Sequence, residues 1–481
     1  MTESLKEKTA KGLFWSGISN TLQQLLGAFF GIFLARLLSP DDYGMIGLLT
    51  IFTAVANSMQ ESGFTSALTN RKEFRHEDYN AVFWFSLGIG SSLYILLFFC
   101  APLIARFYDT PQLTPLARYL FLGFLISSTG TAHNAILFRK LMVKQKAKAT
   151  ITAITLSGSI GVLMAYNGMA YWGIATQSIV YILICNLMFW HYSRWRPTLT
   201  FDFRPIREML PFSSKLLAMS IFRYINDNVF SNIMGRHYPK QEVGYYTQAN
   251  KWTNMGQTTI AGIINGITQP ILVEVGDDAE RQQKVFRKLL RFTAFISFPS
   301  MLGLALIAPE FIIITLTDKW ESSIPIMQIL CIWGAFIPIG YIYTNLLISK
   351  NKSGILMWNT IIQALVIIAM LLFTISYGVL TMVVAYTVIN ILWLFIWHYY
   401  AWRQIRIKLF DVVKDIAPYL LITLAVITSV YYATRTINNI YLLLAAKTGL
   451  AAVLYVSILW KSNSVIFQES VNSLLKKKKR L

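Results

Sequence analysis

The sequence predicts an all-α polytopic membrane protein of about 14 transmembrane helices, and two observations predict it. First, 55% of the 481 residues are hydrophobic and 14% are charged, whereas about a quarter of the residues of a soluble protein are charged. Second, long apolar runs alternate with short basic clusters along the whole chain, leaving no stretch long enough for a large soluble domain. A bilayer suits this composition better than water does.

The apolar runs, read against their breakers, place the expected helices one by one. A membrane-spanning helix needs about 20 mostly apolar residues, and runs of that order occur at 12–36, 43–68, 80–105, 113–138, 147–166, 169–192, 209–235, 243–273, 289–308, 324–349, 355–376, 379–401, 417–434 and 440–460. The first run is longer than the core of a signal peptide and lacks a small-residue cleavage site, so we expect it to remain as the first helix.

Lysine and arginine positions orient these helices. If the N-terminus is cytoplasmic, 32 of the 43 basic residues fall in cytoplasmic segments and six in segments on the other face. Because basic loops stay in the cytoplasm, we expect both termini there. The basic residues form short clusters between apolar runs rather than one broad face, which argues against a nucleic-acid partner.

A short internal repeat divides the chain. Ala35-Arg36 followed by Asp42-Tyr43-Gly44 has a counterpart in Gly235-Arg236 followed by Glu242-Val243-Gly244, displaced by 200 residues. This displacement carries helix one onto helix seven and helix two onto helix eight, so we expect a parallel repeat of two pseudo-symmetric six-helix bundles. The expected division is an N-terminal lobe at 1–208, a second lobe at 209–401, and two additional helices with a basic cytoplasmic tail at 402–481.

The first, second, seventh and eighth helices are unusually polar. Polar side chains are costly in hydrocarbon and usually face a watery cavity or a protein partner. On a 3.6-residue helix, Lys215, Arg223 and Asp227 share one stripe, and so do Lys251 and Asn254. The residues expected to line a central cavity and bind an anionic, sugar-bearing substrate are Arg223, Lys251, Lys215, Asn254, Asn226, Asp227, Arg36 and Gln24.

Each of these residues also has a structural interpretation. Arg223 and Asp227 would equally form an intramembrane ion pair, and Lys215 would reach the interface along its own stem. Arg36 ends the first helix, where it is either a cavity residue or an interface anchor. Glu61, the one acid deep in the first half, is a candidate coupling residue or a hydrogen-bonded structural group.

Patterns of covalent chemistry are missing. The five histidines and three cysteines fit no metal-ligand or disulfide spacing, and no Walker loop or nucleophile elbow occurs. The sequence therefore predicts neither an enzyme nor a protein with a metal ion or cofactor.

Two passages carry a family resemblance: Lys11-Gly12-Leu13-Phe14-Trp15-Ser16, and the run from Ala35 to Gly44 that reads Ala-Arg-Leu-Leu-Ser-Pro-Asp-Asp-Tyr-Gly. With the helix plan they resemble the Wzx-type polysaccharide flippases, in the branch of the colanic acid exporter. Their superfamily also holds multidrug extrusion transporters and the lipid II flippase.

The resemblance implies two lobes around a central cavity in the bacterial inner membrane. It also implies alternating access that moves undecaprenyl-pyrophosphate-linked repeat units from the cytoplasmic to the periplasmic face. The implied partners are the polyprenyl-pyrophosphate-linked glycan, membrane lipids and the polysaccharide polymerase machinery.

Three other functions fit parts of the sequence. A multidrug or cation extruder of the same superfamily would need acidic residues in its lining, whereas the predicted lining is richer in bases. A membrane-embedded polymerase or glycosyltransferase would need a long external loop, and the predicted external connections are short. A scaffold for sugar assembly would not transport.

Overall fold

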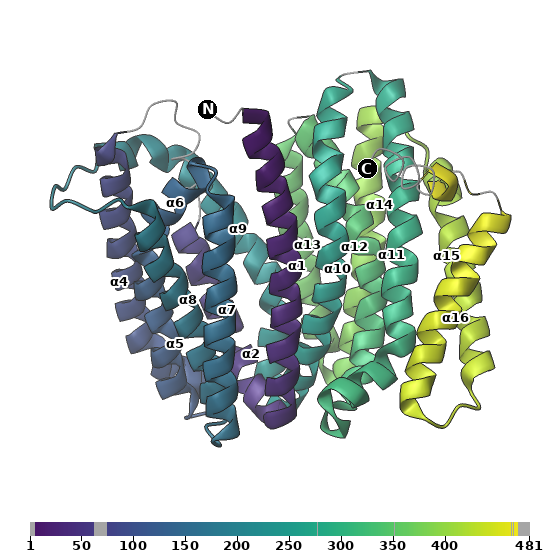
Figure 1. Cartoon of the computed structure of the whole chain (residues 1–481), viewed down its shortest axis with the longest axis horizontal. Coiled ribbons are helices and arrows are strands. Elements are labelled where there is room, and N and C mark those ends of the chain that lie inside the picture. Colours follow the sequence, from purple (N-terminus) through teal and green to yellow (C-terminus); the bar gives the residue numbers. More distant parts are fainter. Residues whose placement is uncertain are drawn as a thin grey trace. The chain divides into compact units, whose positions relative to one another are not determined.

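The computed structural model describes residues 5–61, 75–276, 278–350, 352–462, 464 and 466–469 (Figure 1). Within these helices, the side chains at 5–14, 16, 54–61, 211–227, 265–267, 269–270, 273 and 353 lie outside the described part. All regular secondary structure among the described residues is helical, which confirms the predicted all-α class.

The chain forms two compact units, residues 1–244 and 245–481. The first holds α1 (Leu5–Leu37), α2 (Pro40–Glu61), α4 (His76–Phe107), α5 (Leu113–Ser128), α6 (Thr131–Arg139), α7 (Val143–Tyr166), α8 (Tyr171–Ser193), α9 (Arg204–His237) and the first turn of α10 (Lys240–Glu274). The second holds the rest of α10 with α11 (Ala279–Leu316), η1 (Asp318–Trp320), α12 (Ser323–Ser349), α13 (Ser353–Thr374), η2 (Ile375–Tyr377), α14 (Val379–Ile405), α15 (Leu409–Thr434) and α16 (Ile440–Lys461). The division at 208 and 401 follows the repeat rather than packing, and it stays a prediction.

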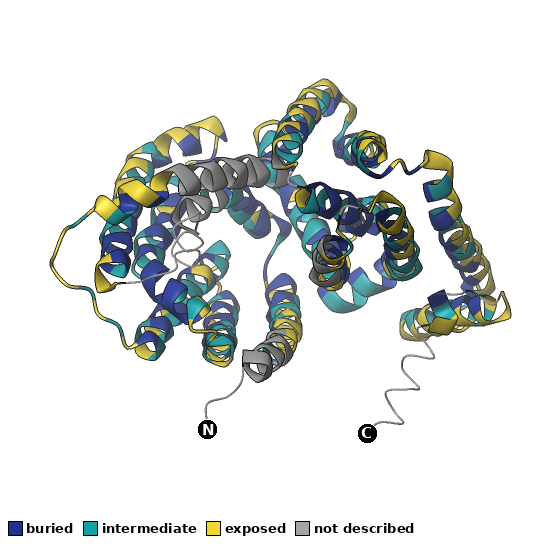
Figure 2. Cartoon of the chain, turned by 90° about the horizontal axis from the view of Figure 1, so that it is seen from above, coloured by how far each residue is buried: buried dark blue, intermediate teal, exposed yellow. Residues whose placement is uncertain are grey.

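In the first unit, α7 packs against both α1 and α8, α4 packs against α5, and α2 packs against α9. Small residues allow the close approaches. A Cβ on Gly158 of α7 would overlap the ring of Phe30 on α1. Seen from above, the buried residues lie mainly where helices face one another and the exposed residues mainly on outer faces (Figure 2).

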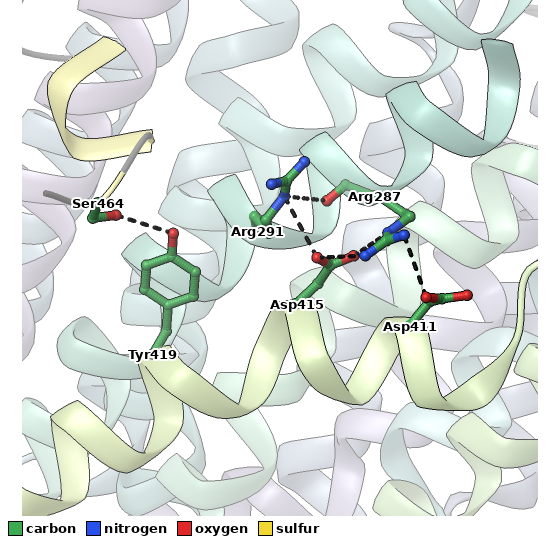
Figure 3. A network of polar contacts seen from close by, with 6 residues as sticks. All are labelled: Arg287, Arg291, Asp411, Asp415, Tyr419 and Ser464. Atoms are coloured by element: carbon green, nitrogen blue, oxygen red, sulfur yellow. Dashed lines mark hydrogen bonds and ion pairs between the residues drawn. The ribbon is translucent and has the colours of Figure 1, made fainter. Parts of the chain in front are cut away.

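The second unit is organised around α11, which contacts α12, α15 and α16. At one end of α11 the Arg287 guanidinium donates to Asp415 at 2.6 Å and to Asp411 at 3.3 Å (Figure 3). Arg291 adds an ion pair with Asp415 at 3.6 Å. Two arginines of α11 therefore hold two aspartates of α15, which fixes the last two helices to this unit.

Ten helices are long and apolar enough to cross a membrane, and the bent pair α5 and α6 raises the number to eleven. The three other long helices, α2, α9 and α10, have 22, 34 and 35 residues, and some of their side chains lie outside the described part. A multi-pass membrane protein is therefore confirmed, while the count of 14 spans stays a prediction.

The expected single helix at 113–138 is instead two helices, α5 and α6, that meet at 47°. Side chains of α8 bind the break: the Asn186 amide donates to the Ile126 carbonyl, and the Trp190 indole donates to the Thr129 carbonyl at 2.8 Å. Gly130 leaves room for Asn186, because a Cβ there would overlap its side chain. Donors from a distant helix replace the lost backbone bonds, and apolar periodicity carries no signal of such donors.

Three prolines inside helices have a common arrangement. A proline removes the hydrogen bond to the carbonyl four residues earlier. The carbonyls freed by Pro102, Pro299 and Pro309 belong to Phe98, Phe295 and Ala305. They accept bonds from Arg118 of α5 at 3.3 Å, Tyr455 of α16 at 2.9 Å and Gln328 of α12 at 3.2 Å, respectively. Each proline thus creates an acceptor that a neighbouring helix occupies.

Candidate functional site

The predicted stripe on α10 lies on an accessible face of that helix. Lys251 and Asn254 are half-buried and Thr258 is exposed, and their spacing of three and four residues keeps them on one side. The Asn254 amide donates to Asn250 at 3.0 Å and accepts from Gln257 at 3.2 Å. These bonds hold the Asn254 side chain in place along the stripe.

The adjoining face of α10 packs inside the second unit. The Trp252 ring lies 5.1 Å from the Phe311 ring of α11, and the Thr253 hydroxyl lies 3.8 Å from the sulfur of Cys331 on α12. Gly334 of α12 allows this approach, because a Cβ there would meet the methyl of Met301 at 2.6 Å. The packing leaves the Lys251 stripe facing away from α11 and α12.

Lys251 brings a positive charge to this stripe. Its ammonium lies 5.5 Å from the centre of the Trp252 ring, a cation–π distance. Among the described residues no acid forms an ion pair with it. The arrangement offers a cation beside amide and hydroxyl groups, a combination suited to phosphate oxygens and sugar hydroxyls.

In the first unit, α1 presents the second described polar stripe. Asn20 and Gln24 are exposed, while Ser19 is buried and accepts a bond from Gln23 at 2.7 Å. Gln24 therefore has an accessible amide, as the sequence predicts. Arg36 is exposed in the last turn of the same helix; whether it binds substrate or anchors the helix stays a prediction.

Several predicted site residues cannot be placed as side chains. Lys215, Arg223, Asn226 and Asp227 lie on α9 and Glu61 ends α2, but their side chains lie outside the described residues. Their roles stay predictions.

The repeated sequence forms a reciprocal contact at the end of the first unit. Helix α1 ends at Leu37 and α9 at His237, and α2 begins at Pro40 and α10 at Lys240, so the helix boundaries repeat at 200 residues. A Cβ on Gly44 would overlap the Lys240 carbonyl oxygen, and a Cβ on Gly244 would overlap the Pro40 carbonyl oxygen. The two glycines of the repeat therefore occupy equivalent positions in one crossing.

Polar contacts surround this crossing. Gln241 donates to Asp41 at 3.0 Å, Arg236 pairs with Asp109 at 2.6 Å, and the Tyr108 hydroxyl donates to Asn232 at 2.7 Å. Asp42 bonds the Ser39 amide at 2.9 Å and the Tyr171 amide at 3.1 Å, so it caps α2 and also contacts the start of α8. The Asp-Tyr-Gly motif thus has a structural role that its resemblance alone does not reveal.

Sequence reasoning did not weigh one buried ion pair. Lys447 of α16 donates to Glu310 of α11 at 2.6 Å and to the Leu306 carbonyl at 3.3 Å, and both charged side chains are buried. The second Glu310 carboxylate oxygen is buried without a hydrogen-bond partner. The available signal was a pair of opposite charges within two otherwise apolar runs, since each should have a partner.

The described residues contain no group of three or more histidine, cysteine, aspartate or glutamate side chains placed to hold a metal ion.

Comparisons with known proteins agree with this architecture. A family model described as "Polysaccharide biosynthesis protein" matches residues 33–325. The chain is 27% identical to the lipopolysaccharide biosynthesis protein WzxC of Escherichia coli K12 over 358 residues, which cover 73% of this chain and 72% of WzxC. It is 22% identical to the succinoglycan biosynthesis transport protein ExoT of Rhizobium meliloti, covering 76% of this chain and 74% of ExoT.

A solved structure shares the fold. The lipid II flippase MurJ in an inward closed conformation has a TM-score of 0.75 at 17% identity, covering 95% of this chain and all of the MurJ chain. The family match spans more than half of the chain and agrees with the motif from Ala35 to Gly44. The protein is a Wzx-type member of the polysaccharide biosynthesis protein family, on the fold that MurJ shares.

Proposed function

We propose that this protein moves lipid-linked oligosaccharide repeat units across the bacterial inner membrane, from the cytoplasmic to the periplasmic face, for surface polysaccharide synthesis. The names of its relatives support this proposal: WzxC and ExoT are named for the biosynthesis of surface polysaccharides, ExoT also for transport, and MurJ for flipping lipid II. In this proposal the protein carries substrate without making or breaking covalent bonds.

The accessible stripe on α10 carries the proposal. Lys251 supplies positive charge for the pyrophosphate of a polyprenyl-linked glycan, while Asn254 and Thr258 supply hydrogen bonds for sugar hydroxyls. A cation in a site of lowered dielectric attracts phosphate more strongly than it would in water. On α9, Arg223 and Lys215 would add charge and Asn226 and Asp227 hydrogen bonds, and Gln24 and Arg36 would contribute from α1.

A cation extruder of the same superfamily is disfavoured by this stripe. Its charged residue is a base, with no described acid paired to it, so the stripe repels a cationic drug. A membrane-embedded polymerase and a non-transporting scaffold are separated from a transporter by a transport assay rather than by geometry.

Several finer features belong to the same proposal. Both termini are cytoplasmic, 14 helices span the membrane, and Glu61 is the coupling candidate. The polysaccharide polymerase machinery is the proposed recipient of the translocated unit.

A vesicle assay tests the proposal. Protein is reconstituted into vesicles holding a fluorescent polyprenyl-pyrophosphate-linked oligosaccharide, and a glycosidase added outside reports which molecules reach the outer leaflet. We expect digestion to pass the roughly half of the substrate in the outer leaflet of protein-free vesicles. Digestion that stops at that level, with protein verified as folded and inserted, would contradict translocation.

A further inference from the structure

The segment 194–203, here named the strap, joins α8 to α9 and is bonded along its length to α4. The Trp195 indole donates to His76 at 2.9 Å, the Thr198 amide donates to Asn80 at 2.9 Å, and the Trp84 indole donates to the Thr198 carbonyl at 2.8 Å. The Asn80 amide also donates to the Thr200 carbonyl at 2.6 Å. These bonds hold the strap in one register on the start of α4.

The strap exposes large apolar side chains. Leu199 is 80% exposed, Phe201 61% and Phe203 45%. Alternate residues of an extended chain point to the same side, so these three side chains share a face while Thr198 and Thr200 serve the bonds to α4. The strap runs outside the helices beside α4 (Figure 1), and most of it is exposed (Figure 2).

Arginines flank this apolar face. Arg194 and Arg196 precede it, Arg204 and Arg207 follow it, and all four are exposed. Asp202, the single acid between Arg194 and Arg207, pairs with Arg204 at 3.3 Å. The strap region therefore carries net positive charge on both sides of three exposed apolar side chains.

Depth and charge together decide what covers this face. The strap connects the ends of two helices at the end of the first unit where α1 begins, so it lies near the boundary between headgroups and acyl chains. Exposed aromatic and aliphatic side chains flanked by arginines are typical of segments that lie in the membrane interface and bind anionic lipids. A water-facing loop would have no reason to expose Leu199 and Phe201 while bonding its polar groups inward.

We propose that the strap is a lipid-binding element: Leu199, Phe201 and Phe203 insert among acyl chains, and the flanking arginines contact phosphates of anionic lipids. Under the proposed topology, these lipids belong to the cytoplasmic leaflet. Because the strap leads directly into α9, the contact fixes the start of that helix against the bilayer surface.

Spin labels test the insertion. Single cysteines at Leu199 and Phe201 are introduced after Cys100, Cys185 and Cys331 are replaced, and the labelled protein is studied in phosphatidylglycerol–phosphatidylcholine vesicles. We expect both labels to collide more with oxygen than with a water-soluble nickel complex, as a label at exposed Val453 in the middle of α16 should. A label at exposed Glu280, in the first turn of the long helix α11, is the water-facing control. Because Leu199 is the most exposed residue of the strap, its label should leave folding intact even if the Phe201 label does not.

A second arm tests the headgroup contact. Removing phosphatidylglycerol, or replacing Arg194 and Arg207 by glutamine, should each lower the immersion depth of the Leu199 label. An unchanged depth in both cases overturns the anionic-lipid contact, and labels that resemble Glu280 overturn insertion. Labels that are wet in vesicles but shielded in native membranes would assign the face to a protein partner and also overturn the proposal. None of these readouts uses transport, so a failure of the proposed function would leave the result standing.

Discussion

Lys447 and Glu310 place two opposite charges inside the second unit, where each depends on the other. Removing one partner from a buried ion pair leaves an uncompensated charge and costs about 3–5 kcal/mol, whereas replacing both with apolar residues is often neutral or stabilising. The pair joins α16 to α11, so its effect should appear as a change in stability.

We therefore expect Lys447→Met and Glu310→Met each to lower the free energy of unfolding by about 3 kcal/mol. The double variant should recover most of the loss, because no charge is then left unpaired. Thermal unfolding in detergent measures all three. A double variant as unstable as the sum of the two single changes would show that the residues do not act as a pair.

Lys251 tests the substrate interpretation at the same scale. Lys251→Gln keeps a polar group and loses the charge, so transport of the lipid-linked sugar should fall at least about tenfold, the value of one charge-assisted hydrogen bond. Lys251→Arg should retain most activity. Lys414→Gln, which removes an exposed base at the start of α15, is the matched control. Normal transport by well-expressed Lys251→Gln protein would make the charge a structural feature.

Residue-level prediction from sequence had a clear physical limit. Spacing placed Lys251, Asn254 and Thr258 on one stripe, because helical periodicity is a local property. It gave no partner for Lys447, because that partner lies 137 residues away. Pairing across helices depends on packing, which periodicity does not encode.

At the scale of elements, the prolines show how the helices of each unit are joined. Pro299 frees the Phe295 carbonyl, and the Tyr455 hydroxyl of α16 occupies it. The second proline of α11 serves α12 through Gln328, and Pro102 of α4 serves α5 through Arg118. A residue that weakens an isolated helix thus provides a specific attachment point between helices.

Tyr455→Phe should lower the free energy of unfolding by about 1 kcal/mol, the net value of one hydrogen bond. In a Pro299→Ala background the same change should cost less, because the restored amide of residue 299 bonds Phe295 itself. A double-mutant cycle of thermal unfolding measures the coupling, with Tyr441→Phe on the exposed face of α16 as control. Equal costs in both backgrounds would contradict the link to proline.

Element boundaries were predictable where composition changes sharply and not where tertiary bonds decide. The expected run 324–349 agrees closely with α12 (Ser323–Ser349). Helix α11 begins ten residues before the expected 289, because its charged first turns continue as helix beyond the apolar run, capped by Asp278. The α5–α6 break was missed because its stabilising donors come from α8.

At the scale of the whole molecule, the distribution of 32 basic residues on one side predicts the topology. Reporter fusions at Asn167, Tyr377 and Asn438 should all report the periplasm, because each follows a helix that leaves the cytoplasm in the proposed order. A fusion at Arg406 should report the cytoplasm and serves as the internal control. Cytoplasmic signals at two of the first three sites would overturn the arrangement.

The repeat leads to a prediction that joins sequence symmetry to stability. Gly44 and Gly244 stand 200 residues apart and occupy matching positions in one crossing, each against a backbone carbonyl of the other helix. Backbone cannot move aside as a flexible side chain does. An added methyl group at either site must therefore separate the ends of α2 and α10.

Gly44→Ala and Gly244→Ala should each lower the free energy of unfolding by about 1–3 kcal/mol, the usual cost of overpacking. Because either methyl group opens the same crossing, the second substitution should add little to the first. Gly27→Ala on α1, where a Cβ meets no atom within 4 Å, is the control and should be neutral or stabilising, since alanine favours helix over glycine. Thermal unfolding of the two single variants and the double variant measures the coupling. Fully additive losses would mean that the glycines form two independent contacts, and the repeat would then be a sequence symmetry without a shared structural role.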